Sequence, residues 1–258
     1  MNHDNIITIY HTNDLHDHRR AVTMAGELPR DQNTLLVDSG DAIGGSNTAF
    51  RFREPVIDLM NRAGYDCMAM GNREFNYLRG VLRIRARQAN FPILCANLVD
   101  TRGKTNDTFT PWITREIAGI KIGIIGLTPV MYPDESIWFR LSGFSFRDPT
   151  ESMARHLPQM RQDSDMVVVL SHLGLDRDRH LALQIPGLDL IIGGHSHKLL
   201  EKPERTGDGF IFNGGCHGRY IGRIQFTPQK TAQGKVMVRN LEYSLIRVAG
   251  KTSGDASP

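Results

Sequence analysis

Apolar runs, each followed by a polar loop and then by a segment of helical spacing, recur along the chain and limit the folds open to it. The runs have the length of buried strands, and they lie at residues 6–10, 34–37, 66–70, 92–96, 165–170 and 188–192. The segments of helical spacing lie at residues 20–28, 54–63, 78–89, 150–161 and 176–184. This alternation predicts an α/β domain whose site lies at the carboxyl ends of the strands.

The remaining segments extend this domain over residues 1–248. Residues 112–114 and 117–127 predict a strand hairpin, and residues 128–149 predict a long irregular loop whose aromatic side chains mostly pack it onto the body. Antiparallel strands that close a second sheet are expected at residues 210–213, 220–227 and 235–248. Residues 249–258 are small and polar, and we expect them to form a disordered tail.

Charge balance and cysteine usage exclude several classes of protein. A net charge of +3 is too small to favour a nucleic-acid polymer or an anionic membrane as partner, and no apolar run reaches transmembrane length. The three cysteines are widely spaced and odd in number, which fits a reducing compartment rather than a disulfide framework. Residues 1–5 are polar, so we expect no signal peptide and a cytoplasmic location. The oligomeric state stays open.

Two histidines follow the apolar run that ends in a pair of glycines. His195 and His197 stand at alternate positions, and this spacing suits two neighbouring metal ions with one imidazole each. A surface loop with two solvated histidines explains this stretch alone equally well. Asp14 and His16 have the same spacing after the first predicted strand, which favours metal binding.

Three further strand ends carry donors of the same kind, namely Asp41, Asn72 and His172. Each residue alone is weak evidence for a metal site, because a Gly-Asp pair is commonly a turn and a lone histidine after a strand is commonly structural. All seven residues together supply enough oxygen and nitrogen donors for two divalent ions, with Asp41 able to bridge them. Such donors without thiolate suit Mn²⁺ first, and also Zn²⁺, Fe, Co²⁺ or Ni²⁺. Two ions about 3.5–4 Å apart can clamp a phosphoryl group, so the predicted partner is a small phosphorylated substrate.

These residues stand in five motifs whose order resembles a known superfamily. The motifs are Asp14-x-His16, Gly40-Asp41, Gly71-Asn72, Ser171-His172 and Gly194-His-Ser-His197. The series resembles the calcineurin-like metallophosphoesterase superfamily, and residues 11–16, 71–75 and 213–222 narrow the resemblance to the N-terminal catalytic domain of the 5′-nucleotidase/UDP-sugar hydrolase family. The resemblance implies a metal-dependent phosphoesterase. It also implies a four-layer αββα sandwich with two central mixed sheets.

The resemblance also implies a role for each ligand. The first ion would be held by Asp14, His16, Asp41 and His197, and the second by Asp41, Asn72, His172 and His195. Asp41 would bridge the two ions, in agreement with the donor count.

Two positions depart from the family's pattern. The family's Gly-Asn-His-Glu-Phe-Asp reads Gly-Asn-Arg-Glu-Phe-Asn at residues 71–76, so Arg73 and Asn76 replace a histidine and the aspartate that orients it. Arginine can donate to phosphate oxygens but cannot give up a proton to a leaving group. We expect catalysis to depend on Arg73, Asn72 and Asp41. The family's separate domain that holds a nucleoside base has no counterpart here, so nucleotide specificity is not implied.

Residues near position 217 leave alternatives open. By the family's pattern Arg219 is a candidate phosphate contact, with a solvated strand arginine as an equal alternative, and His217 is a candidate substrate-binding or acid residue. Cys216 beside His217 suggests a thiol dyad, which we set aside because adjacent residues in a strand point to opposite faces.

Three functions fit the sequence. The preferred one is a dinuclear metal-dependent hydrolase of small phosphate esters, nucleotides included. A phosphodiesterase of the same fold is the first alternative, because its leaving group needs less acid help. A metal-binding sensor that has lost turnover is the second, and the pair Arg73 and Asn76 is the feature that favours it.

Overall fold

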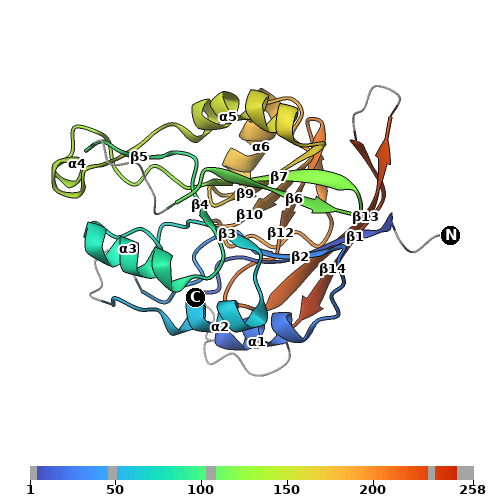
Figure 1. Cartoon of the computed structure of the whole chain (residues 1–258), viewed down its shortest axis with the longest axis horizontal. Coiled ribbons are helices and arrows are strands. Elements are labelled where there is room, and N and C mark those ends of the chain that lie inside the picture. Colours follow the sequence, from blue (N-terminus) through green and yellow to red (C-terminus); the bar gives the residue numbers. More distant parts are fainter. Residues whose placement is uncertain (1–4, 46–50, 103–108, 232–235, 249–258) are drawn as a thin grey trace.

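Two six-stranded sheets organise the computed structural model, which describes residues 5–45, 51–102, 109–231 and 236–248 (Figure 1). The first sheet contains, in spatial order, β14 (Val236–Arg247), β13 (Tyr220–Lys230), β1 (Ile7–Thr12), β2 (Thr34–Asp38), β3 (Cys67–Ala69) and β4 (Ile93–Leu94). The second contains β11 (Glu204–Thr206), β12 (Gly209–Asn213), β10 (Leu190–Gly193), β9 (Met166–Ser171), β7 (Ile120–Leu127) and β6 (Trp112–Ile117). The predicted tail at residues 249–258 lies outside the described residues.

Both sheets are mixed, as predicted. In the first, β1 to β4 run parallel, whereas β13 pairs antiparallel with β1, and β14 with β13. In the second, β7, β9, β10 and β12 run parallel, and the edge strands β6 and β11 run antiparallel. The carboxyl ends of the parallel strands therefore gather at one edge of each sheet, where the predicted site residues follow.

Helices cover the outer faces of both sheets, which completes the predicted four layers. The described helices are α1 (Arg19–Glu27), α2 (Pro55–Ala63), α3 (Arg79–Gln88), α4 (Ile137–Ser142), α5 (Pro149–Asp163) and α6 (Leu175–Gln184). Apolar residues of α1, α2 and α3 pack on the first sheet, and those of α5 and α6 pack on the second (Figure 1). Among the described residues no helix combines the length and the apolar character that a membrane crossing requires.

Alternating side chains place the core in three clusters, one between each pair of layers. Ile122 and Ile124 of β7 meet Ile7 and Ile9 of β1 between the sheets, whereas Ile125 turns toward the outer helices. Because both faces of these strands are buried, their sequences read as continuous apolar runs. This is why the strands of the two sheets were predictable from the sequence.

The prediction for the C-terminal strands was wrong in its pairing. Only β12 joins the second sheet, where it runs parallel to β10, while β13 and β14 extend the first sheet beside β1. Apolar periodicity identifies a strand but not its neighbour, because the same alternation fits either sheet.

Residues 128–149 are more regular than expected. They contain α4 and β8 (Phe144–Phe146), and β8 pairs antiparallel with β5 (Leu98–Asp100). The packing role of their aromatic side chains is confirmed for Tyr132, Phe144 and Phe146, which are buried around Phe75. Trp138 is 42% exposed and stacks on Tyr77 instead.

The start of α5 also differs from the prediction. The helix begins at Pro149, one residue before the predicted segment 150–161, and Asp148 caps it, because the Asp148 carboxylate accepts hydrogen bonds from the backbone N–H groups of Thr150 and Glu151 at 2.8 and 3.0 Å.

Candidate metal centre

The seven predicted metal-ligating residues all lie on loops that follow carboxyl ends of parallel strands. Asp14 and His16 follow β1, Asp41 follows β2, Asn72 follows β3, His172 follows β9, and His195 and His197 follow β10. Backbone hydrogen bonds tie the first two loops together: the N–H of Asp14 donates to Gly40 O, and the N–H of His16 donates to Asp41 O, each at 2.9 Å. The two sheets thus bring residues from distant parts of the sequence to one place.

The first predicted group surrounds Asp14. The Nε2 of His197 lies 3.4 Å from Asp14 Oδ1 and 3.0 Å from the Nε2 of His16. Asp14, His16 and Asp41 each offer one ligand atom, and these atoms lie within 4.8 Å of one another. Two carboxylates and imidazoles at this spacing form a donor set for a divalent ion.

The second predicted group continues from Asp41. The Nε2 of His172 lies 3.3 Å from Asp41 Oδ1, and the Nδ1 of His195 lies 3.0 Å from Asn72 Oδ1. The rings of His172 and His195 are 5.1 Å apart between centroids. Asp41 therefore lies between the two groups, in the position expected of a bridging carboxylate.

Five of these residues have backbone conformations that non-glycine residues rarely adopt. The φ angles of Asp14, His16, Asp41, His195 and His197 lie between 49° and 68°. Positive φ at non-glycine residues costs of order 1–3 kcal/mol each and persists only where surrounding contacts impose it. Its concentration at the predicted ligands indicates that the loops are held in a geometry suited to a site.

Glu74 supplies part of this support, although its place in the 71–76 motif predicted no role for it. Its buried carboxylate accepts hydrogen bonds from the backbone N–H groups of Gly71, Asp41 and Ile43 at 2.7, 2.9 and 3.2 Å. It therefore joins the loop that carries Asp41 to the loop that carries Asn72. Nothing in the linear motif distinguishes this contact, because its partners are backbone groups.

His172 tests whether these residues fit a cation. Its Nδ1 lies 2.8 Å from Ser39 O and donates to it, so Nε2 is the ring nitrogen that can offer a lone pair to a cation in place of a proton. Nε2 is buried, has no hydrogen-bond partner among the described residues, and faces both Asp41 and Asp14. A cation beside Nε2 would satisfy the nitrogen and both carboxylates, so the donor set fits a divalent metal ion.

Charge within the cluster leads to the same conclusion. Burial acts to lower the pKa of His172, but Asp41 and Asp14 outweigh it and raise that pKa to about 9. Burial acts to raise the pKa of Asp14, but His197 and His172 outweigh it, so the pKa of this carboxyl is lowered. The pKa of Asp41 is lowered in the same way, by His172. The carboxylates thus stay ionised and attract positive charge, which a proton or a metal ion can supply.

Arg73 lies beside the cluster. Its backbone N–H donates to Asp41 Oδ1 at 2.8 Å, and its Nε lies 3.7 Å from Asp41 Oδ2. The guanidinium is partly exposed, so it can reach a ligand at the site. Asn76 is buried, and its Oδ1 accepts a hydrogen bond from Leu78 N, in the turn before α3.

His217 lies closer to the ligands than expected. Its ring centroid is 5.1 Å from that of His16 and 5.4 Å from that of His197, and these three histidines form a second possible ligand cluster. Burial lowers the pKa of His217, and the nearby charges of His18, His197 and Arg219 lower it further. Arg219 itself is exposed, and its charge acts on the pKa of His217.

The reason given against a thiol dyad was wrong, although the dyad gains no support. Cys216 and His217 lie in the loop between β12 and β13 and not in a strand, and Sγ is 3.5 Å from Nδ1. Burial raises the pKa of the Cys216 thiol, which disfavours the reactive thiolate.

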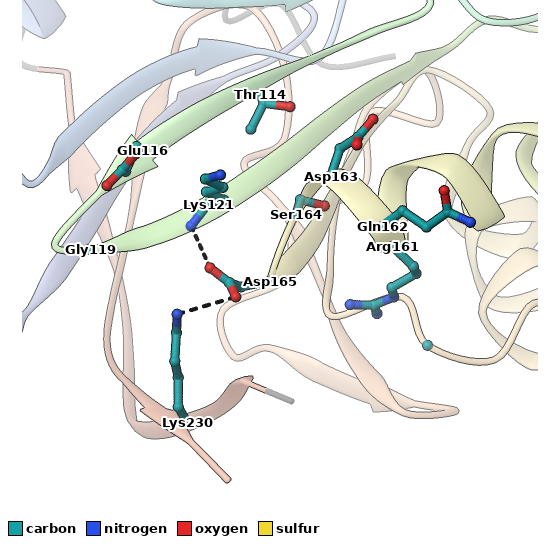
Figure 2. A pocket seen from close by; sticks show the side chains of 11 residues that line it. Thr114, Glu116, Gly119, Lys121, Arg161, Gln162, Asp163, Ser164, Asp165 and Lys230 are labelled. Carbon is teal, nitrogen blue, oxygen red and sulfur yellow. Dashed lines mark hydrogen bonds and ion pairs between the residues drawn. The ribbon is translucent and has the colours of Figure 1, made fainter. Parts of the chain in front are cut away.

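A hollow of about 990 Å³ lies at the opposite ends of the second sheet's strands (Figure 2). Asp165 precedes β9 there, and its carboxylate accepts a hydrogen bond from the backbone N–H of Lys121 and pairs with Lys230 at 3.3 Å. Because His172 follows the other end of β9, this hollow is separate from the candidate metal centre.

Comparisons with known proteins agree with this geometry. The chain is 31% identical to snake venom 5′-nucleotidase of Gloydius brevicauda, over 75% of this chain and 37% of that protein. It is 30% identical to a 2′,3′-cyclic-nucleotide 2′-phosphodiesterase/3′-nucleotidase of Haemophilus influenzae, over 72% of this chain and 33% of that protein. The chain therefore spans well under half the length of these two relatives.

A solved structure extends the likeness to the whole described fold. The calcineurin-like phosphoesterase YfkN from Bacillus subtilis superposes with a TM-score of 0.76 at 26% identity, over 95% of this chain and 92% of that chain. The sequence pattern of the calcineurin-like phosphoesterases matches residues 7–199, which include all seven predicted ligands. With homologues among the 5′-nucleotidases, this chain belongs to the calcineurin-like phosphoesterase family and is a hydrolase.

Proposed function

We propose that the chain hydrolyses small phosphate esters, nucleotides among them, with two divalent ions held by the candidate centre. The observation that supports this most is the buried Nε2 of His172, which has no hydrogen-bond partner among the described residues and faces Asp14 and Asp41. The first ion is assigned to Asp14, His16, Asp41 and His197, and the second to Asp41, Asn72, His172 and His195. Mn²⁺ is the first choice of metal for these oxygen and nitrogen donors.

The bound ions supply Lewis acidity that draws negative charge from a phosphoryl group and makes water a stronger acid. The chain's own groups position the reactants. The carboxylate of Glu74 holds the backbone N–H groups of Asp41 and of Gly71, the residue before Asn72. The backbone N–H of Arg73 donates to the Asp41 carboxylate, and the Arg73 guanidinium can donate to phosphoryl oxygens beside it.

The proton for the leaving group must come from a different residue in this chain than in family members that have a histidine where this chain has Arg73. A guanidinium can donate hydrogen bonds to phosphate oxygens but cannot give up a proton to a leaving group, so Arg73 stabilises charge without acting as a general acid. His217 is the remaining titratable ring next to the first group, and it is the acid to examine if the leaving group is protonated.

Diester hydrolysis is a second candidate. The replacement of the family's histidine by Arg73 favours it, because a diester's leaving group can need less acid help. The name of the Haemophilus influenzae relative includes both a cyclic phosphodiesterase and a nucleotidase activity. Arg73 beside Asp41 can contact the phosphoryl oxygens of a monoester or of a diester, which carry different negative charges.

A turnover assay tests the proposal. The chain is reconstituted with Mn²⁺ and supplied with an aryl phosphate and with an aryl phosphodiester. Faster cleavage of the monoester supports the phosphatase, and faster cleavage of the diester supports the alternative. No turnover of either, with two ions bound, would overturn the proposal and leave a metal-binding sensor.

A series of aryl and alkyl phosphates tests the role of Arg73. General acid catalysis is typically worth about 10²–10⁴-fold, so an enzyme without it depends steeply on the leaving group. We expect this steep dependence in the wild type, and a flatter one in Arg73→His combined with Asn76→Asp. Arg73→Ala should slow all substrates by a similar factor. If it slows none, Arg73 does not act on the substrate.

A further inference from the structure

A cavity of about 360 Å³ opens beside the second group of predicted ligands. Asn72 and His195 form one part of its lining, and Arg177 forms another. The other lining residues are apolar or proline, namely Pro129, Val130, Met131 and Leu173. A substrate held at the metal centre can therefore extend along apolar walls toward one cation.

Arg177 is placed there by the start of α6. This helix begins beside His195, because the N–H of Leu175 donates to Ser196 Oγ at 3.2 Å and the loop at Gly174 lies against the His195 ring. Arg177 stands in the first turn of the helix and is exposed. Its backbone is thus fixed relative to the centre, while its side chain can move to meet a ligand.

Within the described residues the guanidinium of Arg177 forms no hydrogen bond and no ion pair. Arg179, two residues along the same helix, instead holds Glu204 with two hydrogen bonds of 2.7 Å and Asp176 with one of 2.8 Å. A basic side chain in the first turn of a helix is also unfavourable toward the helix dipole. Arg177 therefore costs some stability and contributes no contact that offsets it.

Neighbouring charges indicate the side from which an anion would approach. Arg177 also borders a second hollow, whose lining includes Asp148 and Glu151. An anion entering from that side would meet these carboxylates, whereas the lining of the 360 Å³ cavity contains no acidic residue. The side of Asn72 and His195 is thus the favourable one.

We propose that Arg177 determines specificity by holding a second anionic group, a carboxylate or a phosphate, on the part of the substrate that leaves the reacting phosphorus. The preferred substrates are phosphate esters whose leaving group has an apolar body and an anion at its far end. This inference rests on the proposed phosphoesterase function for the reaction itself. What it adds to that function is that the cavity selects substrates by the charge of their leaving group.

A pair of isosteric substrates measures this selectivity. The probes are 4-carboxyphenyl phosphate and 4-carbamoylphenyl phosphate, which differ in the charge of one group. The ratio of their kcat/KM values is compared among the wild type, Arg177→Ala and Arg179→Ala, all reconstituted with Mn²⁺. The intrinsic reactivity of each ester is the same for all three proteins, so a difference in the ratio between two proteins reflects a difference in how they recognise the charged group.

We expect Arg177→Ala to lower the ratio roughly tenfold, mainly through KM, because a charge-assisted hydrogen bond to the carboxylate is lost. Arg179→Ala removes the same charge from the same helix but not from the cavity, so its ratio should equal that of the wild type. An unchanged ratio in Arg177→Ala, or an equal fall in both variants, would overturn the inference. Arg177→Gln keeps a polar side chain but removes the charge, and it should lower the ratio in the same way.

Binding of the matching phosphonates, 4-carboxyphenylphosphonate and 4-carbamoylphenylphosphonate, separates this inference from the proposed function. Calorimetry on the metal-loaded proteins gives the same ratio without turnover. Absence of turnover together with Arg177-dependent preference for the carboxylate would refute the function and support the inference. Turnover without any such preference would support the function and refute the inference.

Discussion

Gly71→Ala tests whether close backbone packing holds Asp41 in place. An added Cβ at Gly71 would lie 2.3 Å from both the backbone nitrogen and Oδ1 of Asp41, and 2.7 Å from Glu74 Oε2. Ordinary contact begins near 3.4 Å, so the Asp41 loop must move by roughly 1 Å to admit the methyl group. Overpacking of this kind typically costs about 1–3 kcal/mol of unfolding free energy.

The same displacement should weaken metal binding. Metal–ligand distances tolerate errors of only about 0.2 Å, and mutations that disturb ligand support commonly lower affinity about 10–100-fold. We expect Gly71→Ala to lower the affinity for Mn²⁺ by a factor within this range, as measured by calorimetric titration. Its unfolding free energy should fall by about 1–3 kcal/mol in chelator, measured by chemical denaturation.

Gly80→Ala is the matched control. Gly80 lies in the first turn of α3, and an added Cβ there meets nothing within 4 Å. Alanine is favoured over glycine in helices by roughly 0.5–1 kcal/mol, so this variant should be slightly more stable and bind Mn²⁺ as the wild type does. Equal stability and equal Mn²⁺ affinity in Gly71→Ala and the wild type would refute the view that this contact positions Asp41.

Three further predictions concern the body of the protein. Burial lowers the pKa of His11 to about 3, so between pH 6.5 and 5 the unfolded chain protonates His11 and the folded chain does not. Through this residue the unfolding free energy should fall by about 2 kcal/mol over that range. His11→Gln should remove this contribution to the pH dependence, as measured by denaturation across the same range. Asp148→Ala removes the α5 cap and should cost about 0.5–2 kcal/mol, and an unchanged melting temperature would contradict the assigned cap. Arg85→Ala removes the buried partner of Glu54 at 3.3 Å and leaves it the more exposed Arg51 at 3.8 Å, so it should cost about 3–5 kcal/mol. A cost below about 1 kcal/mol in denaturant would show that the pair with Arg85 is not needed.

Most strands of the fold could be predicted because strands buried on both faces leave continuous apolar runs, whereas the four layers were implied by the family resemblance. The pairing of β12, β13 and β14 could not, since it depends on contacts between residues far apart in the sequence, such as Ile9 of β1 opposite Ile224 of β13. Periodicity describes one strand at a time. It carries no information about which of two sheets a strand completes.

The ligand types and their spacing brought the candidate ligands to attention, because polar groups at strand ends converge in an α/β fold. Glu74 was missed because its partners are backbone N–H groups whose position depends on the folded turns. The cavity at Arg177 was missed for a similar reason. Its lining comes from four separate loops and a helix, so no local motif marks it.

The metal content of the chain is the most direct test of the dinuclear centre. Elemental analysis after reconstitution and removal of free ions should give two divalent ions per chain, together with phosphate-ester turnover. Asp41→Asn should keep its circular dichroism spectrum but lose both bound metal and turnover, because an amide cannot balance the charge of two ions as the carboxylate of Asp41 does. No more than trace metal in the reconstituted wild type, or wild-type turnover in Asp41→Asn, would contradict the proposed centre.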